Sequence, residues 1–178
     1  MKYLDFLKSK MAIATDSGFD VPDKEINTAL KPHQRDIVKW AVKGGKRAVF
    51  AKFGLGKSVI QLEWCTQVID HEGGKALIIC PLGVKQEFVH DAVEILGYDA
   101  PTYVKNMAEV TACSADIMIT NYERVRDGDI DVKYFTATSL DEAAVLRSFG
   151  SKTYQEFLKK FNGVPYKLVA TATPDPNK

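Results

Sequence analysis

The residues of this chain whose types and spacing best fit a chemical role lie in the segment Ala51-Lys-Phe-Gly-Leu-Gly-Lys57-Ser58. An apolar run precedes it and an amphipathic stretch follows it, which predicts a strand, a loop and a helix in that order. In such a loop the backbone N–H groups surround a polyphosphate, and the helix directs its positive dipole end to the same anion. We therefore predict that Lys57 reaches the terminal phosphates of a nucleotide and that Ser58 ligates Mg²⁺. The other loop residues predicted to contact the nucleotide are Phe53, Gly54, Leu55 and Gly56.

The match to a phosphate-binding loop (P-loop) is incomplete, because Ala51 stands where the strict G-x-x-x-x-G-K-[ST] pattern has its first glycine. Only the second half of the pattern is met. The alternative for this segment alone is an ordinary surface loop with a chance Gly-Lys-Ser. Hydrolysis of a nucleotide would also need groups from elsewhere in the chain, so those groups decide between the two interpretations.

A pair of acids, Asp141 and Glu142, follows an apolar segment far downstream of the P-loop. At the end of a strand, Asp141 could complete the shell of the Mg²⁺ ion, and Glu142 could orient or deprotonate the attacking water. Paired acids also occur in solvated loops, which is the alternative for this pair taken alone. The presence of both elements in the order that a hydrolytic site requires favours the functional interpretation.

Two weaker signals flank these elements. Thr171 and Thr173 follow the last apolar segment, and their hydroxyls could hydrogen-bond the acidic loop and transmit the state of the nucleotide. Gln34 precedes the P-loop, and its amide offers the donor and the acceptor that the Hoogsteen edge of adenine requires. The alternatives are ordinary strand-end residues for the threonines and an exposed helical residue for Gln34.

Short apolar segments alternate with amphipathic ones, which predicts an α/β fold of three layers with a mostly parallel sheet. Strands are expected at 48–51, 76–80, 102–104, 116–120, 134–140 and 166–170. Helices are expected at 32–42, 57–70 and 86–96, with another after a capping box of Thr153 and Glu156. A helix at 3–10 and an irregular lead-in would make residues 1–27 distinct from a domain over 28–178. Ligands of such sheets bind beyond the carboxyl ends of the strands, where the P-loop lies.

The bulk composition excludes several classes of protein. The 178 residues carry a net charge of +1, so no global field indicates a nucleic-acid partner and any such contact must be local. The three cysteines, Cys65, Cys80 and Cys113, lack metal-ligand spacing and suit free thiols in a reducing compartment. No apolar run reaches the roughly 20 residues of a membrane span. We expect a cytoplasmic protein without a membrane partner.

Taken together, these residues resemble the first RecA-like domain of a superfamily 2 helicase or translocase. The resemblance covers the chain from about residue 28. It is nearest to phage-encoded DEAD-like helicases, in which motif II precedes a segment similar to 146–153. It implies the cytoplasm of a bacterium or of a phage-infected host. The segments that carry it are Leu30-Lys-Pro-His-Gln34 (the adenine-reading Q motif in its Swi/Snf-like form), 51–58 (motif I), Ile78-Ile-Cys-Pro-Leu82 (motif Ia), Ile119-Thr-Asn-Tyr-Glu123, Asp141-Glu-Ala-Ala144 (motif II, the DEAD position) and Thr171-Ala-Thr173 (motif III).

The resemblance implies a role for each matching residue. Lys57, Ser58, Asp141 and Glu142 would bind and hydrolyse ATP with Mg²⁺, and Gln34 with Arg35 would meet adenine. The residues implied in nucleic-acid binding are Pro81, Leu82, Gly83, Lys85, Asn121 and Tyr122. Arg147, Ser148 and Lys152 could make a further phosphate contact, and a solvated basic loop is the equally favoured alternative.

The implied activity is that of an ATP-binding domain that moves on DNA, with RNA as the alternative, when a second RecA-like domain joins it in the same or another polypeptide. Motif II ends in Ala143 and Ala144, so the contact to motif III made by a polar fourth residue is missing or replaced. By itself the domain should bind ATP weakly and hydrolyse it slowly. The rival function is a catalytically silent regulatory or interaction module. A small kinase is disfavoured, because the segments at 30–34 and 119–123 would then be coincidences.

Overall fold

The computed structural model describes residues 15–144, 146 and 150–172, and these contain a six-stranded parallel sheet with the strand order β1-β6-β5-β2-β4-β3. All five pairings between neighbouring strands are parallel. The strands are β1 (Lys46–Phe50), β2 (Ala76–Ile79), β3 (Thr102–Tyr103), β4 (Ile117–Thr120), β5 (Ala137–Asp141) and β6 (Tyr166–Thr171). The predicted α/β class and mostly parallel sheet are therefore confirmed.

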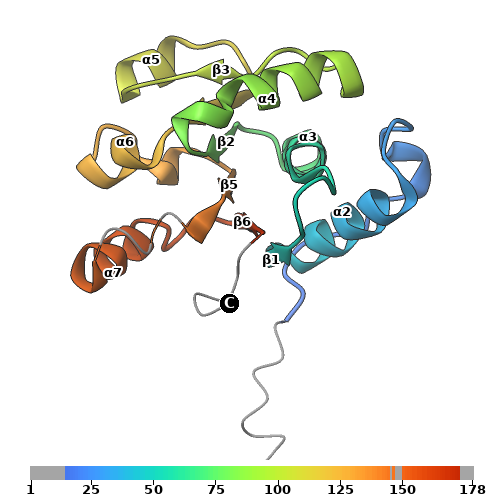
Figure 1. The fold of residues 1–178 in the computed structure, drawn as a ribbon, viewed down its shortest axis with the longest axis horizontal. Helices are drawn as coiled ribbons and strands as arrows, with labels where there is room; N and C mark the ends of the chain where they lie inside the picture. The colour runs from blue at the N-terminus through green and yellow to red at the C-terminus, as the bar shows by residue number, and fades with distance from the viewer. Residues whose placement is uncertain (1–14, 145, 147–149, 173–178) are drawn as a thin grey trace, which may run out of the picture.

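Helices cover both faces of the sheet (Figure 1). One face carries α2 (Pro32–Gly44), α3 (Lys57–Glu72) and α4 (Lys85–His90), which continues into the π-helical segment η3 (Asp91–Leu96). The other carries α5 (Met107–Ala112), α6 (Tyr122–Asp127) and α7 (Ser151–Lys160). Single turns of 3₁₀-helix include η1 (Asp23–Glu25), η2 (Leu82–Val84) and η4 (Val132–Tyr134).

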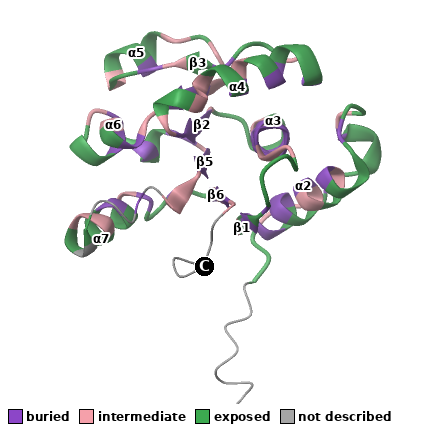
Figure 2. Ribbon diagram, viewed as in Figure 1, coloured by how far each residue is buried: buried purple, intermediate pink, exposed green. Residues whose placement is uncertain are grey.

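The two faces of the sheet bury two separate cores. Along β2, Ala76 and Ile78 pack on the side of α3, whereas Leu77 and Ile79 pack on the side of α6 and α7. This alternation follows from the two-residue period of a strand. All four residues are buried, as Figure 2 shows for the central strands, and this explains why the strand is a continuous apolar run rather than an alternating one.

Several sequence predictions needed correction. The strand predicted at 134–140 starts only at Ala137, because residues 132–134 form η4. The capping box of Thr153 and Glu156 is wrong: α7 starts at Ser151 after Gly150, and its N-terminus has no side-chain cap. Helices α5 and α6 were not predicted, being only six residues long. The helix predicted at 3–10 lies outside the described residues.

Two of the three cysteines are buried, as their apolar neighbours predicted. All three thiols are free, and Cys113 is half-buried. Burial raises the pKa of the Cys65 thiol and raises that of Cys80 to about 12. None of the helices in the described part of the chain has the length and hydropathy of a bilayer-spanning segment.

The lead-in before α2 packs onto α3 through a buried carboxylate. Glu63 is fully buried and accepts hydrogen bonds from the backbone N–H of Asn27 (3.0 Å), Nε2 of Gln67 (2.9 Å) and the hydroxyl of Tyr98 (2.5 Å). Val21 and Ile26 join the core on the same side. The carboxylate therefore links Asn27 of the lead-in and Tyr98 to α3, the helix that follows the P-loop.

Removing this carboxylate should destabilise the fold. The substitution Glu63→Ala removes the shared acceptor of these three donors from the core and is expected to lower the free energy of unfolding by about 2–4 kcal/mol. Urea denaturation measures the change, with Glu94→Ala at an exposed position as the control. Equal stability of the two variants would contradict the linking role of Glu63.

Candidate nucleotide-binding site

The predicted catalytic residues meet around a hollow of about 300 Å³ at the carboxyl ends of the strands. Three segments form its walls: the P-loop with the start of α3, the end of β5 with Glu142, and the chain from Pro81 to Asp91. The residues that line it are Phe53, Gly54, Gly56, Lys57, Ser58, Pro81, Val84, Glu87, Phe88, Asp91, Asp141 and Glu142. The P-loop and the acidic pair, far apart in sequence, thus share one site.

The P-loop turns on two glycines in the left-handed region, Gly54 (φ +81°) and Gly56 (φ +72°). A Cβ atom on Gly56 would lie 2.3 Å from Nε2 of Gln34, so this position also requires close approach. Ala51 is buried, and its backbone N–H donates to the carbonyl of Thr171 (3.2 Å). Because Ala51 has no positive φ, the missing first glycine does not prevent the turn.

The side chains of Lys57 and Ser58 both contact other residues. The ammonium of Lys57 lies over the ring of Phe53, 4.6 Å from its centroid, and Phe53 itself is 78% exposed. The hydroxyl of Ser58 lies 2.5 Å from Oδ2 of Asp91 and 3.4 Å from Oε1 of Glu87. Both groups therefore face the hollow with partners that a phosphate or a cation would join or displace.

Asp141 is held at the end of β5 by a buried amide. Its Oδ1 accepts a hydrogen bond from Nε2 of Gln61 (2.8 Å), and Oε1 of Gln61 accepts one from the hydroxyl of Ser139 (2.7 Å). Asp141 is only 8% exposed. Burial raises the pKa of its carboxyl, while the Gln61 hydrogen bond and the charge of Lys57 act in the opposite direction. A cation in the hollow would favour the charged form further.

Glu142 adopts a backbone conformation that is unusual for its residue type. Its φ is +50°, and it is the one non-glycine with positive φ in the described ranges. Such strain persists where the surrounding structure over-determines it, and it concentrates at functional sites. Oε1 of Glu142 accepts a hydrogen bond from the hydroxyl of Thr171 (3.1 Å). The hydrogen bond expected between the threonine segment and the acidic loop is thus present at Thr171, while Thr173 lies outside the described residues.

Gln34 is buried rather than exposed, and it holds the P-loop. Its Oε1 accepts from the backbone N–H of Lys31 (2.8 Å), and its Nε2 donates to the carbonyl of Leu55 (3.1 Å). A side-chain amide has two N–H donors and two acceptor lone pairs, so one of each remains for adenine. Arg35 donates to the carbonyls of Asp23 and Asn27. The role of both residues toward adenine stays a prediction.

The oxygen donors around the hollow fit a magnesium ion. Ser58 and Asp141 supply a hydroxyl and a carboxylate, the hard ligands that Mg²⁺ prefers. Among the described residues no three His, Cys, Asp or Glu side chains form a self-sufficient metal cluster. In nucleotide sites Mg²⁺ takes one or two ligands from the protein, and phosphates and water supply the others.

The residues predicted to contact nucleic acid divide into two groups. Leu82 and Gly83 are exposed, Pro81, Lys85 and Asn121 are half-buried, and all five follow the carboxyl ends of β2 and β4. Tyr122 is a correction: it is 1% exposed, and its hydroxyl donates to the backbone carbonyl of Asp141 (2.7 Å), so it supports the acidic loop from the core.

Sequence reasoning missed four residues that the fold brings to these sites. Glu87 and Asp91 contact Ser58, and Gln61 contacts Asp141. At the other site, the hydroxyl of Tyr103 donates to Oδ1 of Asn121 (3.1 Å). The centroid of the Tyr103 ring lies 5.0 Å from Nζ of Lys85. Helical spacing could have found some of them. Gln61 lies three residues after Ser58, and Asp91 lies four after Glu87, so each pair shares a helix face.

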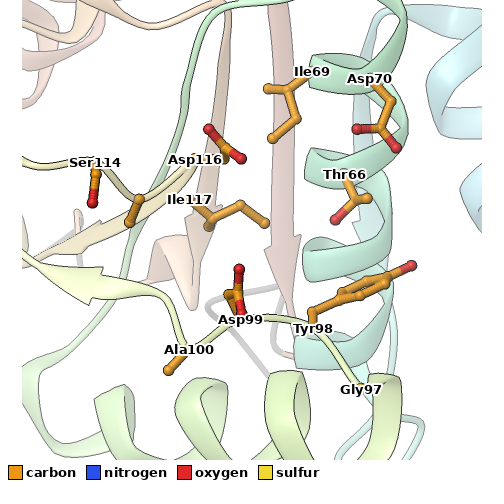
Figure 3. A pocket seen from close by; sticks show the side chains of 11 residues that line it. Thr66, Ile69, Asp70, Gly97, Tyr98, Asp99, Ala100, Ser114, Asp116 and Ile117 are labelled. Atoms are coloured by element: carbon orange, nitrogen blue, oxygen red, sulfur yellow. The ribbon is translucent and has the colours of Figure 1, made fainter.

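A larger hollow of about 550 Å³ lies at the opposite ends of the strands (Figure 3). It lies between the second half of α3, the chain at 97–100 and the start of β4. The charged side chains labelled there, Asp70, Asp99 and Asp116, are all acidic. The hollow contains none of the predicted site residues, and its charge disfavours a polyphosphate.

Comparison with known proteins supports the fold. No protein-family model and no curated protein sequence matches this chain. Among solved structures, the chain resembles the Sulfolobus solfataricus SWI2/SNF2 ATPase core in complex with dsDNA, with a TM-score of 0.67 and 18% identity over 93% of this chain. It also resembles the UvsW helicase from bacteriophage T4, with a TM-score of 0.69 and 16% identity over 100% of this chain.

These similarities show that the chain shares its α/β fold with that ATPase core and with the phage helicase. A second T4 UvsW structure matches with a TM-score of 0.64 and 16% identity over 97% of this chain. The chain spans 35% of the Sulfolobus chain and 62% and 35% of the two UvsW chains.

The amide that holds Asp141 can be tested by a substitution of similar size. Gln61→Leu removes both hydrogen bonds and leaves Asp141 and Ser139 without these partners in the core. We expect the melting temperature to fall by about 3–10 °C. Differential scanning calorimetry measures it, with Gln155→Leu at an exposed position of α7 as the control. A Gln61→Leu protein as stable as the control would show that the amide does not support the end of β5.

Proposed function

We propose that this chain is the ATP-binding domain of a nucleic-acid-dependent ATPase, of the DNA helicase or translocase kind. The observation that carries the proposal is the convergence of Lys57, Ser58, Asp141 and Glu142 on one hollow at the carboxyl edge of a RecA-like sheet. In sheets of this kind ligands bind at that edge. The fold shared with a SWI2/SNF2 ATPase core and a phage helicase supports the same assignment.

Each residue then has a role in binding and hydrolysis. The N–H groups of the P-loop and the start of α3 bind the phosphates, and the Lys57 ammonium leaves the Phe53 ring to contact them. Ser58 and Asp141 hold Mg²⁺, which neutralises phosphate charge when bound. Glu142, fixed by its strained backbone and by Thr171, orients the attacking water. Gln34 reads adenine with its spare donor and acceptor.

The proposed nucleic-acid surface lies beside this hollow, beyond the ends of β2 and β4. Lys85 supplies a positive charge, Tyr103 an aromatic ring and Asn121 an amide, and they contact one another directly or through Tyr103. DNA is the proposed partner, with RNA as the alternative. Because the whole chain carries a net charge of only +1, binding by this domain alone is expected to be weak and salt-sensitive.

A second RecA-like domain completes the proposed enzyme, in the same polypeptide or another. In related NTPases an arginine supplied across such an interface accelerates turnover by about 10³–10⁵-fold. We therefore expect slow hydrolysis by this chain alone. The rival proposal, a regulatory module that binds nucleotide without hydrolysing it, predicts no turnover under any condition.

The test is binding and steady-state hydrolysis of ATP with Mg²⁺, with and without single- and double-stranded DNA. We expect Lys57→Ala to weaken ATP binding about tenfold or more, because a hydrogen bond to a charged group contributes about 1.5–3 kcal/mol. Lys159→Ala, at an exposed position of α7, serves as the charge-matched control.

The outcomes separate the two proposals. Turnover that DNA stimulates and Lys57→Ala abolishes supports the ATPase. ATP binding that Lys57→Ala weakens, without turnover even when a second domain is supplied, supports the regulatory module. Failure of the unmodified chain to bind ATP would overturn both.

A further inference from the structure

Asp91 lies at a structural irregularity beside the P-loop. Helix α4 ends at His90, and the π-helical segment η3 begins at Asp91. Turns of π-helix are rare and occur often at functional sites, where they direct a side chain that regular helix would place elsewhere. Asp91 is 9% exposed, an unusual degree of burial for a carboxylate. Its position is explained by Ser58, whose hydroxyl donates a buried hydrogen bond to Oδ2 of Asp91.

The hydrogen bond fixes how the Ser58 oxygen can be used. A hydroxyl has one proton and two acceptor lone pairs, and it ligates a cation through a lone pair. With its proton donated to Oδ2 of Asp91, the oxygen keeps its lone pairs for a ligand. Glu87 is a poorer acceptor, since its Oε1 lies 3.4 Å from Ser58 Oγ and its side chain is exposed.

A nucleophilic serine is a different use of the same residues, and the connectivity excludes it. In a catalytic triad the histidine lies between the serine and the carboxylate, and it removes the serine proton. Here the order differs: Oδ1 of Asp91 lies 3.1 Å from Nδ1 of the exposed His90, and Oδ2 meets Ser58. The carboxylate is therefore placed to orient the hydroxyl and not to activate it through an imidazole.

We propose that Asp91 is a positioning residue for the divalent cation of the nucleotide: it holds the Ser58 hydroxyl so that the oxygen lone pairs face the Mg²⁺ ion. The inference rests on the proposed nucleotide-binding function and deepens it. Asp91 also adds a negative charge behind the ligand oxygen, which strengthens its interaction with a cation. Partners of this kind typically change metal affinity by about 10–100-fold when they are replaced.

The test measures the metal separately from the nucleotide. The chain binds a fluorescent N-methylanthraniloyl-ATP first in EDTA and then at increasing Mg²⁺, and Mn²⁺ electron paramagnetic resonance reports the bound metal directly. For Asp91→Asn we expect nucleotide affinity in EDTA within about twofold of wild type and an Mg²⁺ midpoint raised about tenfold or more. Glu94→Gln, exposed on the same η3 segment, removes the same charge and should leave the midpoint unchanged.

A double-mutant cycle separates orientation of the hydroxyl from a general loss of charge. In a Ser58→Ala background the effect of Asp91→Asn on the Mg²⁺ midpoint should largely disappear, because the hydroxyl that Asp91 orients is gone. An undiminished effect in that background, or a midpoint for Asp91→Asn equal to that of Glu94→Gln, would overturn the proposal.

Two further outcomes are distinguishable. Should Asp91→Asn melt below the assay temperature, Asp91→Glu takes its place, since the longer side chain moves the carboxylate away from its position against Ser58. A raised midpoint then supports the proposal, and an unchanged one overturns it. If wild type binds no nucleotide in EDTA or in Mg²⁺, the proposed function itself has failed. If wild type binds nucleotide but its Mg²⁺ midpoint does not depend on Asp91, only the inference about Asp91 has failed.

Discussion

The arrangement of the candidate site depends on one buried amide, that of Gln61. It joins α3, the helix that follows the P-loop, to Ser139 and Asp141 on β5. An unpaired polar group at this depth would cost about 1–3 kcal/mol, so the two ends of the amide fix the register between helix and strand. The acidic pair is thereby held opposite the P-loop before any ligand arrives.

Further hydrogen bonds hold Asp141, Glu142 and Ser58 in place. Tyr122 bonds the Asp141 carbonyl from the opposite core, Thr171 bonds Glu142 from β6, and Asp91 bonds Ser58 from η3. The strained backbone of Glu142 is tolerated because Asp141, the residue before it, pairs with Ala170 of β6, and the Glu142 side chain accepts a hydrogen bond from Thr171. The proposed ATPase function uses this preorganisation, since groups already in place need little rearrangement when the nucleotide binds.

The sequence predicted the long, strongly patterned elements and the motifs that depend on local chemistry. The apolar run at 76–80 and the Gly-Lys-Ser turn were found because strand burial and glycine conformation act over a few residues. Tyr122 was wrongly predicted to contact nucleic acid, because its place in a family motif does not reveal whether its ring faces solvent or the core. Asp91 and Gln61 were missed because helical spacing places them on a face with Glu87 and Ser58 without revealing their distant partners: Asp91 meets Ser58 of α3, and Gln61 meets Asp141 of β5. The π-helical segment had no signal in the spacing of 86–96 either.

A crystal structure of the chain with Mg²⁺ and a non-hydrolysable ATP analogue tests the account most directly. The account predicts the triphosphate against the backbone of 54–58, with Mg²⁺ between Ser58 and Asp141, and the adenine beside Gln34. An analogue bound elsewhere, such as the hollow lined by Asp70 and Asp116, with the P-loop unchanged, would contradict it.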